Sequence, residues 1–243
     1  MFTPDTYENF NRLVKMGKAK VIGTPLIKAY SFEGDVMCRP VPMMFAYANN
    51  NRKFSDEVVF HFDKDTIINN ITFGLNNSAL SSITSNPKYP VKDQVTIINF
   101  LENYKTAFAL KRIDYIESIF ADDALIIVGQ FVRTANNVES PYANNKLVRY
   151  NRMNKQTYIK NLKQAFESQE FININFEDSR IQKMAKGGNI YGIEIKQNYY
   201  SSSYGDQGYL FLMVDLNAEP LIHIRAWQPE KGANGRTIEP SDF

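Results

Sequence analysis

The sequence has a single cysteine, Cys38, so no internal disulfide can form. This fits a reducing compartment, although a bacterial exported protein without disulfides would look the same. No run of about 18 apolar residues is present, so we expect no membrane-spanning helix. The first residues, MFTPDTYENFNRLVKMG, lack the charged and then apolar order of a signal peptide. We therefore expect a cytoplasmic protein, and an exported form with a trimmed start stays open.

Common catalytic and cofactor motifs are also missing. The chain has no G-x-G-x-x-G or P-loop pattern, no G-x-S-x-G nucleophile elbow and no H-E-x-x-H helix. These absences argue against the usual nucleotide-binding enzymes, serine hydrolases and zinc proteases, and we expect no cofactor. His61 and Asp63 share one face of a strand, but two ligands do not make a metal site. The turn that follows, Asp63-Lys64-Asp65, is typical of a hairpin, so we expect no metal.

Charge of one sign is not in excess. The chain has 28 Lys and Arg against 26 Asp and Glu, a formal net charge of +2. This balance predicts neither nucleic-acid binding nor attraction to an anionic membrane. Hydrophobic residues make up 44% of the 243 residues, which is enough for a sizeable core in one or two domains.

The order of elements predicts an α+β protein with two domains. Residues 1–17 are typical of a short helix, and residues 18–75 contain five β-like runs separated by turn-forming residues. Residues 76–91 are rich in Ser, Asn and Pro and have little periodicity, so we interpret them as a linker. The second domain is expected over residues 92–228, and residues 229–243 form a loose tail.

The second domain begins with a clear helical pattern and ends in strands. One apolar stripe is formed at helical spacing by Ile97, Leu101, Tyr104 and Phe108. A shorter helix, an apolar β-run at residues 124–132, a long polar stretch at 133–154 and a third helix at 155–168 follow. Four strands joined by short turns then predict an antiparallel meander.

This order resembles that of the NTF2-like superfamily, the SnoaL-like or cystatin-like α+β cones. The resemblance rests on FLENYKTAFALKRIDYIESIFADDALIIV and on the final LIHIRAWQP, and it covers roughly Lys92 to Gln228. It implies a curved antiparallel sheet packed on three helices, a pocket inside the cone, and dimers through the outer sheet face. Members range from isomerases and dehydratases to transport factors and inert scaffolds, so the resemblance leaves function open. The β-rich module before it resembles no family that we recognise.

The last strand carries the most distinctive row of side chains. Strand alternation puts Leu221, His223, Arg225 and Trp227 on one face, and Ile222, Ile224, Ala226 and Gln228 on the other. If the apolar second face packs on the helices, the His-Arg-Trp row faces outward and suits a partner or a dimer. If the sheet curls the other way, the same row lines the cone. The sequence does not decide between these, and an ordinary solvated row is the default expectation.

Neighbouring strands offer three further candidates. Tyr199 and Tyr209 lie on the two strands before the last one, where tyrosine provides rigid contact area with a polar tip. Asp215 ends an apolar strand, where a buried carboxylate is a candidate general base, although an acid beside a turn more often serves the turn. The pair Asp122-Asp123 is expected to be a solvated helix-to-strand turn.

We therefore expect a non-catalytic protein that binds a ligand or another protein, as a dimer or part of an assembly. The ligand is a small apolar molecule in the cone, and the candidate contact residues are Arg225, Trp227, Tyr199 and Tyr209. The alternative is a small-molecule isomerase or lyase in which Asp215, His223 and Tyr199 converge in the pocket, one group moving a proton and Tyr199 stabilising an oxyanion.

Overall fold

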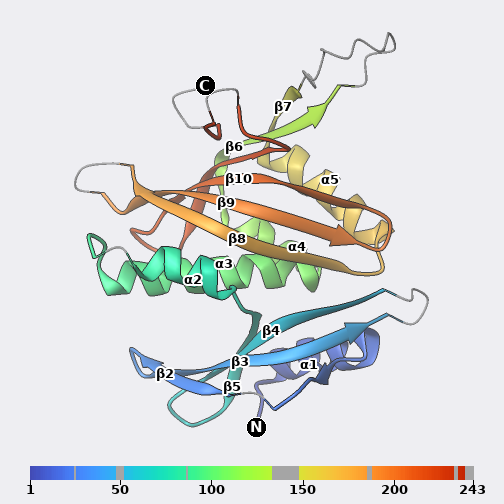
Figure 1. Cartoon of the computed structure of the whole chain (residues 1–243), viewed down its shortest axis with the longest axis vertical. Helices are drawn as coiled ribbons and strands as arrows, with labels where there is room; N and C mark the ends of the chain where they lie inside the picture. The colour runs from blue at the N-terminus through green and yellow to red at the C-terminus, as the bar shows by residue number, and fades with distance from the viewer. Residues whose placement is uncertain are drawn as a thin grey trace.

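The computed structural model describes residues 1–24, 26–47, 52–85, 87–132, 148–184, 188–232 and 235–238. Two β-sheets lie one above the other, and the long helix α3 (Val91–Ala109) runs between them (Figure 1). No helix in these ranges is long and apolar enough to cross a membrane. The described strands up to Phe73 form one sheet and those from Phe120 onward form the other, and the division into two domains stays a prediction.

In the N-terminal module, residues 1–75, the residues that the structure describes form one helix and a five-stranded antiparallel sheet in the order β1-β3-β4-β5, with β2 also paired to β3. Its elements are α1 (Pro4–Gly17), β1 (Lys20–Val21), β2 (Lys28–Phe32), β3 (Asp35–Ala46), β4 (Lys53–Phe62) and β5 (Ile68–Phe73). The five strands match the five β-like runs of the sequence. Leu13 of α1 packs against Val41 and Phe45 of β3, which gives this module a core of its own.

The segment interpreted as a linker contains a helix, α2 (Asn77–Thr84). Asn76 caps it, because its side-chain oxygen accepts a hydrogen bond from the Ala79 N–H at 2.9 Å. Ala79 and Ile83 are fully buried in the core of the C-terminal part. The structure therefore differs from the sequence interpretation: few apolar residues are present here, but they lie on one face of a helix.

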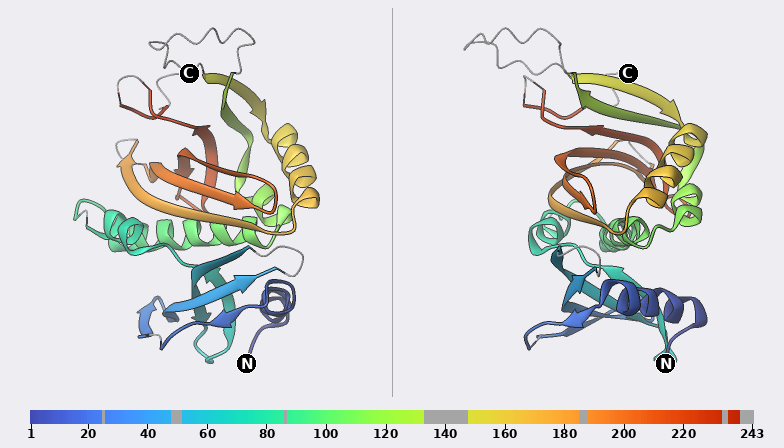
Figure 2. Two further views of the ribbon diagram at one scale, coloured as in Figure 1. Left: turned by 45° about the vertical axis from the view of Figure 1, so that its right-hand side comes forward. Right: turned by 90° about the vertical axis from the view of Figure 1, so that its right-hand side faces the viewer.

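In the C-terminal cone, residues 91–228, the described residues form three helices and a six-stranded sheet in the order β7-β6-β11-β10-β9-β8. Besides α3, its elements are α4 (Ile113–Ser118), β6 (Phe120–Phe131), β7 (Val148–Asn154), α5 (Lys155–Ser168), β8 (Ile172–Lys183), β9 (Ile190–Ser201), β10 (Gly205–Asp215) and β11 (Leu221–Gln228). The meander β8 to β11 is antiparallel as expected, but β6 pairs with β11 in parallel, so the sheet is mixed. Figure 2 shows how strongly it curves, with α3 along one end and α5 at one side.

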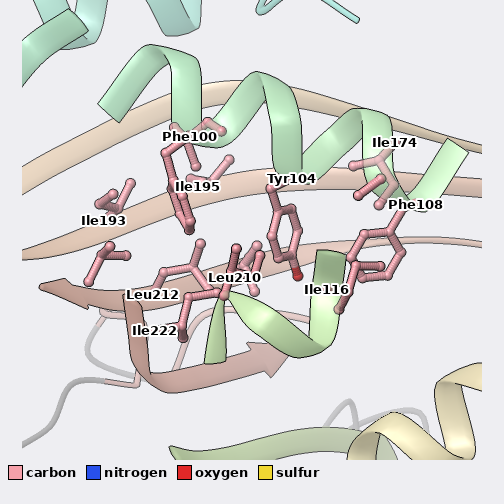
Figure 3. Packing of buried hydrophobic residues seen from close by; sticks show 14 of the residues in the cluster. Phe100, Tyr104, Phe108, Ile116, Ile174, Ile193, Ile195, Leu210, Leu212 and Ile222 are labelled. Atoms are coloured by element: carbon pink, nitrogen blue, oxygen red, sulfur yellow. The ribbon is translucent and has the colours of Figure 1, made fainter. Parts of the chain in front are cut away.

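The core of the cone lies between α3 and the concave face of the sheet. The predicted stripe of α3 is buried, and Tyr104 and Phe108 lie over the aliphatic side chains of β8 to β11 (Figure 3). Burying side chains of this size stabilises the fold by about 1.5–3 kcal/mol each. Leu210 and Leu212, in the inward row of β10, are fully buried, so this part of the sheet packs closely against the helix.

Two boundaries differ from the sequence expectation. Strand β6 begins at Phe120, so Asp122 and Asp123 lie within a strand and not at the end of a helix. Both are exposed, and Asp122 forms an ion pair with Lys155 at 2.9 Å. The end of the long polar stretch, residues 148–154, forms β7, and residues 133–147 lie outside the described residues.

Buried charges join the N-terminal module to the other face of α3. Glu102 is fully buried and pairs with Arg39 of β3 at 2.7 Å, and Lys105 pairs with Asp56 of β4 at 2.8 Å. The Leu75 N–H also donates to Glu102 at 2.9 Å. Because α3 carries apolar side chains on one face and these charges on the other, it packs against the large sheet and forms ion pairs with the N-terminal sheet.

The outer face of the large sheet carries a second, smaller apolar cluster. Ile127, Phe211 and Ala226 form it, and Ile238 of the tail packs against them. The Gln228 side chain fixes this return of the chain, because its amide oxygen accepts a hydrogen bond from the Ile238 N–H at 2.7 Å. In the tail, Ile238 packs on the sheet while residues 230–232 and 235–236 are exposed, so the loose tail expected stays a prediction. A dimer or partner on this face stays a prediction.

Candidate functional site

A cavity of about 780 Å³ opens inside the cone, between the concave face of the sheet and helix α5. Its apolar wall is contributed by α3, α5, β6 and β8, through Phe108, Leu162, Val128 and Ile174. Its polar wall is contributed by β9, β10 and β11, through Gln197, Tyr199, Asp206, Arg225 and Trp227. The cavity therefore brings together residues that lie far apart in the sequence.

A β-bulge at His223 determines which side chains of β11 enter the cavity. Ile222 pairs with Val214 and Ile224 pairs with Met213, so His223 is an extra residue without a partner in the ladder. The extra residue reverses the alternation: Ile222 is buried in the concave core, and so are Arg225 and Trp227 farther along. The row expected from simple alternation is thus split, and only Arg225 and Trp227 of its polar members face the cavity.

Arg225 is the cation of the cavity. Its side chain is 8% exposed, its Nε donates to the Tyr104 hydroxyl at 3.1 Å, and its guanidinium lies 5.2 Å from the centre of the Tyr158 ring. Burial and the neighbouring guanidinium act in opposite directions on Tyr158, and burial prevails, so the pKa of Tyr158 is raised. Tyr158 therefore contacts the guanidinium as a neutral ring and does not neutralise its charge.

Asp206 is the acid of the cavity, and the sequence analysis missed it. It lies across from Tyr199 in the β9–β10 ladder, and its Oδ2 accepts a hydrogen bond from the Tyr204 hydroxyl at 2.7 Å. Burial raises the pKa of Asp206, and the Tyr204 hydrogen bond and the charge of Arg225 offset this only in part. Burial, with a smaller contribution from Asp206, also raises the pKa of Tyr199 to about 12.

Three residues that line the cavity each carry a buried polar atom without a hydrogen-bond partner among the described residues. These atoms are Oδ1 of Asp206, Oε1 of Gln197 and Nε1 of Trp227. Gly208 allows the indole of Trp227 to lie against β10, since a Cβ there would come within 2.7 Å of the ring and 2.4 Å of the Gln228 carbonyl oxygen. The indole is thus held at the wall with its N–H unused.

The residues proposed as a catalytic trio do not come together. Tyr199 lines the cavity, but Asp215 lies at the far end of β10, where its Oδ1 accepts hydrogen bonds from the backbone and side-chain nitrogens of Asn217, both at 2.7 Å. This is turn chemistry. His223 sits at the bulge and is not among the lining residues. Tyr209 alternates with the inward Leu210, so it lies on the outer face, beneath the ammonium group of Lys231.

A metal site is not formed by the acidic and histidine residues in the described ranges, which contain no group of three potential ligands. The turn after His61 is an Asx turn, because Oδ1 of Asp63 accepts hydrogen bonds from the N–H groups of Asp65 and Ile67, both at 2.9 Å. What the cavity offers is one guanidinium, one carboxyl group with a raised pKa, and several hydroxyls in apolar surroundings. These groups suit binding of a polar-ended apolar molecule, and they also suit transfer of a proton.

The sequence contains a signal for both Asp206 and Gln197. Strand β10 begins at Gly205, so Asp206 lies within the strand. Counting back by twos from the inward Leu210 passes Gly208 and reaches Asp206, a lone acid in an apolar row. Gln197 likewise alternates with the inward Ile193 and Ile195.

Comparisons with known proteins give fold likeness only. The sequence matches no protein-family model and no curated protein. Naphthalene 1,2-dioxygenase with indole bound is similar at TM-score 0.45 and 8% identity, over 59% of this chain and 81% of that one. A protein with a cystatin-like fold from Nostoc punctiforme reaches 0.39 and 8% over 57% and 92%.

Bd1075 of Bdellovibrio bacteriovorus is similar at TM-score 0.42 and 14% identity, over 57% of this chain but only 41% of its own. Likenesses of this size concern the fold of the matched part and say nothing about function. The stronger observation is the topology of the described residues: α3 and α4, then β6 and β7, then α5, then β8 to β11, with these strands forming one curved sheet around a cavity. By this order and topology, the C-terminal part of the chain resembles the NTF2-like superfamily in fold.

Proposed function

We propose that this protein binds a small organic molecule in the cavity of its cone and releases it unchanged. The observation that carries the proposal is the set of unpartnered atoms on Asp206, Gln197 and Trp227. A buried polar group without a partner costs about 1–3 kcal/mol, and a bound molecule that supplies the partner recovers that cost. The apolar wall opposite them offers surface to the rest of the same molecule.

The size of the cavity supports the same proposal. Ligand pockets typically measure about 300–1,000 Å³, and the cavity of about 780 Å³ lies in this range. A second cavity of about 840 Å³ lies between the N-terminal module and helices α3 and α4. Among its described lining residues only Asn99 has a buried polar atom without a partner, so we place the ligand in the cone.

Trp227 provides the test, because it is the only tryptophan of the chain and its indole lines the cavity. We expect its fluorescence to change on titration with members of a library of small apolar and aromatic molecules. Ala165→Phe, at the cavity on α5, is expected to abolish these changes. The neighbouring Gln164→Phe adds the same ring outside the cavity and is expected to preserve them. Equal binding by both variants would show that the ligand does not bind in the cone.

A second candidate function, proton transfer on the bound molecule, is favoured by Asp206. A carboxyl group whose pKa is raised by burial, next to tyrosine hydroxyls, is suited to accept and return a proton. An incubation in heavy water distinguishes the two functions. The ligand is recovered after a long time, and its mass and deuterium content are measured. Unchanged ligand supports binding alone. Exchange that disappears in Asp206→Asn, with binding retained, would instead make the protein an enzyme.

A further inference from the structure

Arg225 is a buried cation without a counter-ion. Its side chain is 8% exposed, and no carboxylate forms an ion pair with it in the part of the chain that the structure describes. Asp206 is close enough to feel its charge, but Asp206 directs Oδ2 to the Tyr204 hydroxyl. Buried charges in proteins are normally paired, because an unpaired one loses its hydration without compensation.

The contacts of Arg225 leave one end of the guanidinium for a ligand. Nε is occupied by the Tyr104 hydroxyl of α3 at 3.1 Å, and Cζ lies 5.2 Å from the centre of the Tyr158 ring of α5. The terminal nitrogens have no hydrogen-bond partner among the described residues, and the residue lines the cavity. A guanidinium held in this way presents a fixed fork of donors, which matches the two oxygens of a carboxylate.

A second free donor lies beside it on the same strand. Trp227 is two residues farther along β11 on the same concave face, so the two side chains start about 7 Å apart. Its Nε1 is buried and has no partner within the described ranges. Two unused donors, one of them charged, therefore adjoin a wall of Phe108, Leu162 and Ile174.

We propose that the molecule bound in the cone is an organic anion, a carboxylate with an apolar body, whose oxygens accept hydrogen bonds from Arg225 and Trp227. This inference rests on the proposed binding function and adds the charge and class of the ligand. The described lining residues include one acid, Asp206, which directs Oδ2 to the Tyr204 hydroxyl. Burial raises its pKa, which brings its neutral form nearer, and the neutral form can donate a hydrogen bond to an anion.

The experiment compares matched pairs of probes by Trp227 fluorescence and by calorimetry. The pairs are phenylacetate with phenylethanol, cyclohexanecarboxylate with cyclohexylmethanol, and decanoate with decanol. Each pair keeps the apolar body and changes the charge. For the pairs that bind, we expect the carboxylate to bind at least about tenfold more tightly than the alcohol, about 1.4 kcal/mol.

Variants then assign the preference to Arg225. Arg225→Met is expected to bring the carboxylate-to-alcohol ratio close to one, while Arg180→Met, which removes an exposed charge from β8, leaves it unchanged. Should Arg225→Met fail to fold, Arg225→Lys keeps the charge without the fork and is expected to reduce the ratio severalfold.

The outcomes distinguish this inference from the proposed function. If the alcohols bind as tightly as the carboxylates, or more tightly, the inference that the ligand is an anion is wrong, while the proposed binding function stands. A ratio that survives Arg225→Met overturns the role of Arg225. Probes that do not bind in any pair, together with a library without binders, overturn both the inference and the proposed function.

Discussion

Protonation of His61 is expected to destabilise the folded protein at mildly acidic pH. His61 lies on β4, is 8% exposed, and has its Nε2 3.0 Å from the Thr72 hydroxyl. Burial, and to a smaller extent the positive charge of Arg39, lower its pKa to about 4. In the unfolded chain both influences vanish and an ordinary pKa of about 6.5 applies. The folded state thus binds this proton much more weakly than the unfolded state does.

The sign and size of the effect follow from this difference. The folded pKa is the lower one, so the contribution is fully present above about pH 6.5 and is lost as pH falls toward about 4. A difference of about 2.5 units at about 1.36 kcal/mol per unit gives about 3 kcal/mol in total. Between about pH 7 and pH 5, the loss is about 2 kcal/mol.

Urea unfolding at these two pH values, for the wild type and His61→Gln, measures the effect. Carboxylates that titrate in the same range are present in both proteins, so the difference between the two isolates His61. We expect the free energy of unfolding of the wild type, minus that of His61→Gln, to fall by about 2 kcal/mol between about pH 7 and pH 5. His223→Gln leaves His61 as the only histidine, and its ring protons then report the folded pKa by NMR. A midpoint close to 6.5, or a difference independent of pH, would refute the reasoning.

Two further predictions concern the charged contacts of α3 and the shape of the cavity. Glu102→Ala leaves Arg39 buried without its partner, so we expect a loss of about 3–5 kcal/mol in urea unfolding, whereas Asp122→Ala, which breaks an exposed pair, costs less than about 1 kcal/mol. Equal losses of stability in the two variants would show that the Arg39–Glu102 pair is solvated. Gly208→Ala brings a methyl group against the indole of Trp227, so we expect shifted Trp227 emission and weakened ligand binding. Gly205→Ala, whose Cβ would lie 3.3 Å from the Tyr200 ring and 3.5 Å from the Tyr199 carbonyl oxygen and would not meet Trp227, is expected to change neither. An unchanged spectrum in Gly208→Ala would contradict the packing described here.

Periodicity in the sequence was sufficient for the elements that bury one continuous face. The stripe of α3 and the alternation of β8 to β10 were predictable, because each has apolar residues on one side over several turns or pairs. The helix α2 was missed for the opposite reason: Ala79 and Ile83 are its only fully buried side chains, and the surrounding Ser and Asn residues are typical of loops. The buried Arg39–Glu102 pair was equally hidden, because pairing of charges depends on how two sheets meet across one helix.

The site shows why a correct strand does not yield a correct face. Strand β11 was predicted with nearly its observed bounds, and the alternation argument then fails at a single residue, His223, which the bulge adds without any change in composition. Before the bulge Ile222 points into the cone, and after it Arg225 and Trp227 do. Apolar and polar residues of the same strand therefore both line the concave face of the sheet. Ile224 and Ala226 then lie on the outer face, where Ile238 packs against them. The bulge therefore explains how one strand closes the core at one end of the cone and supplies its cation and its indole donor at the other.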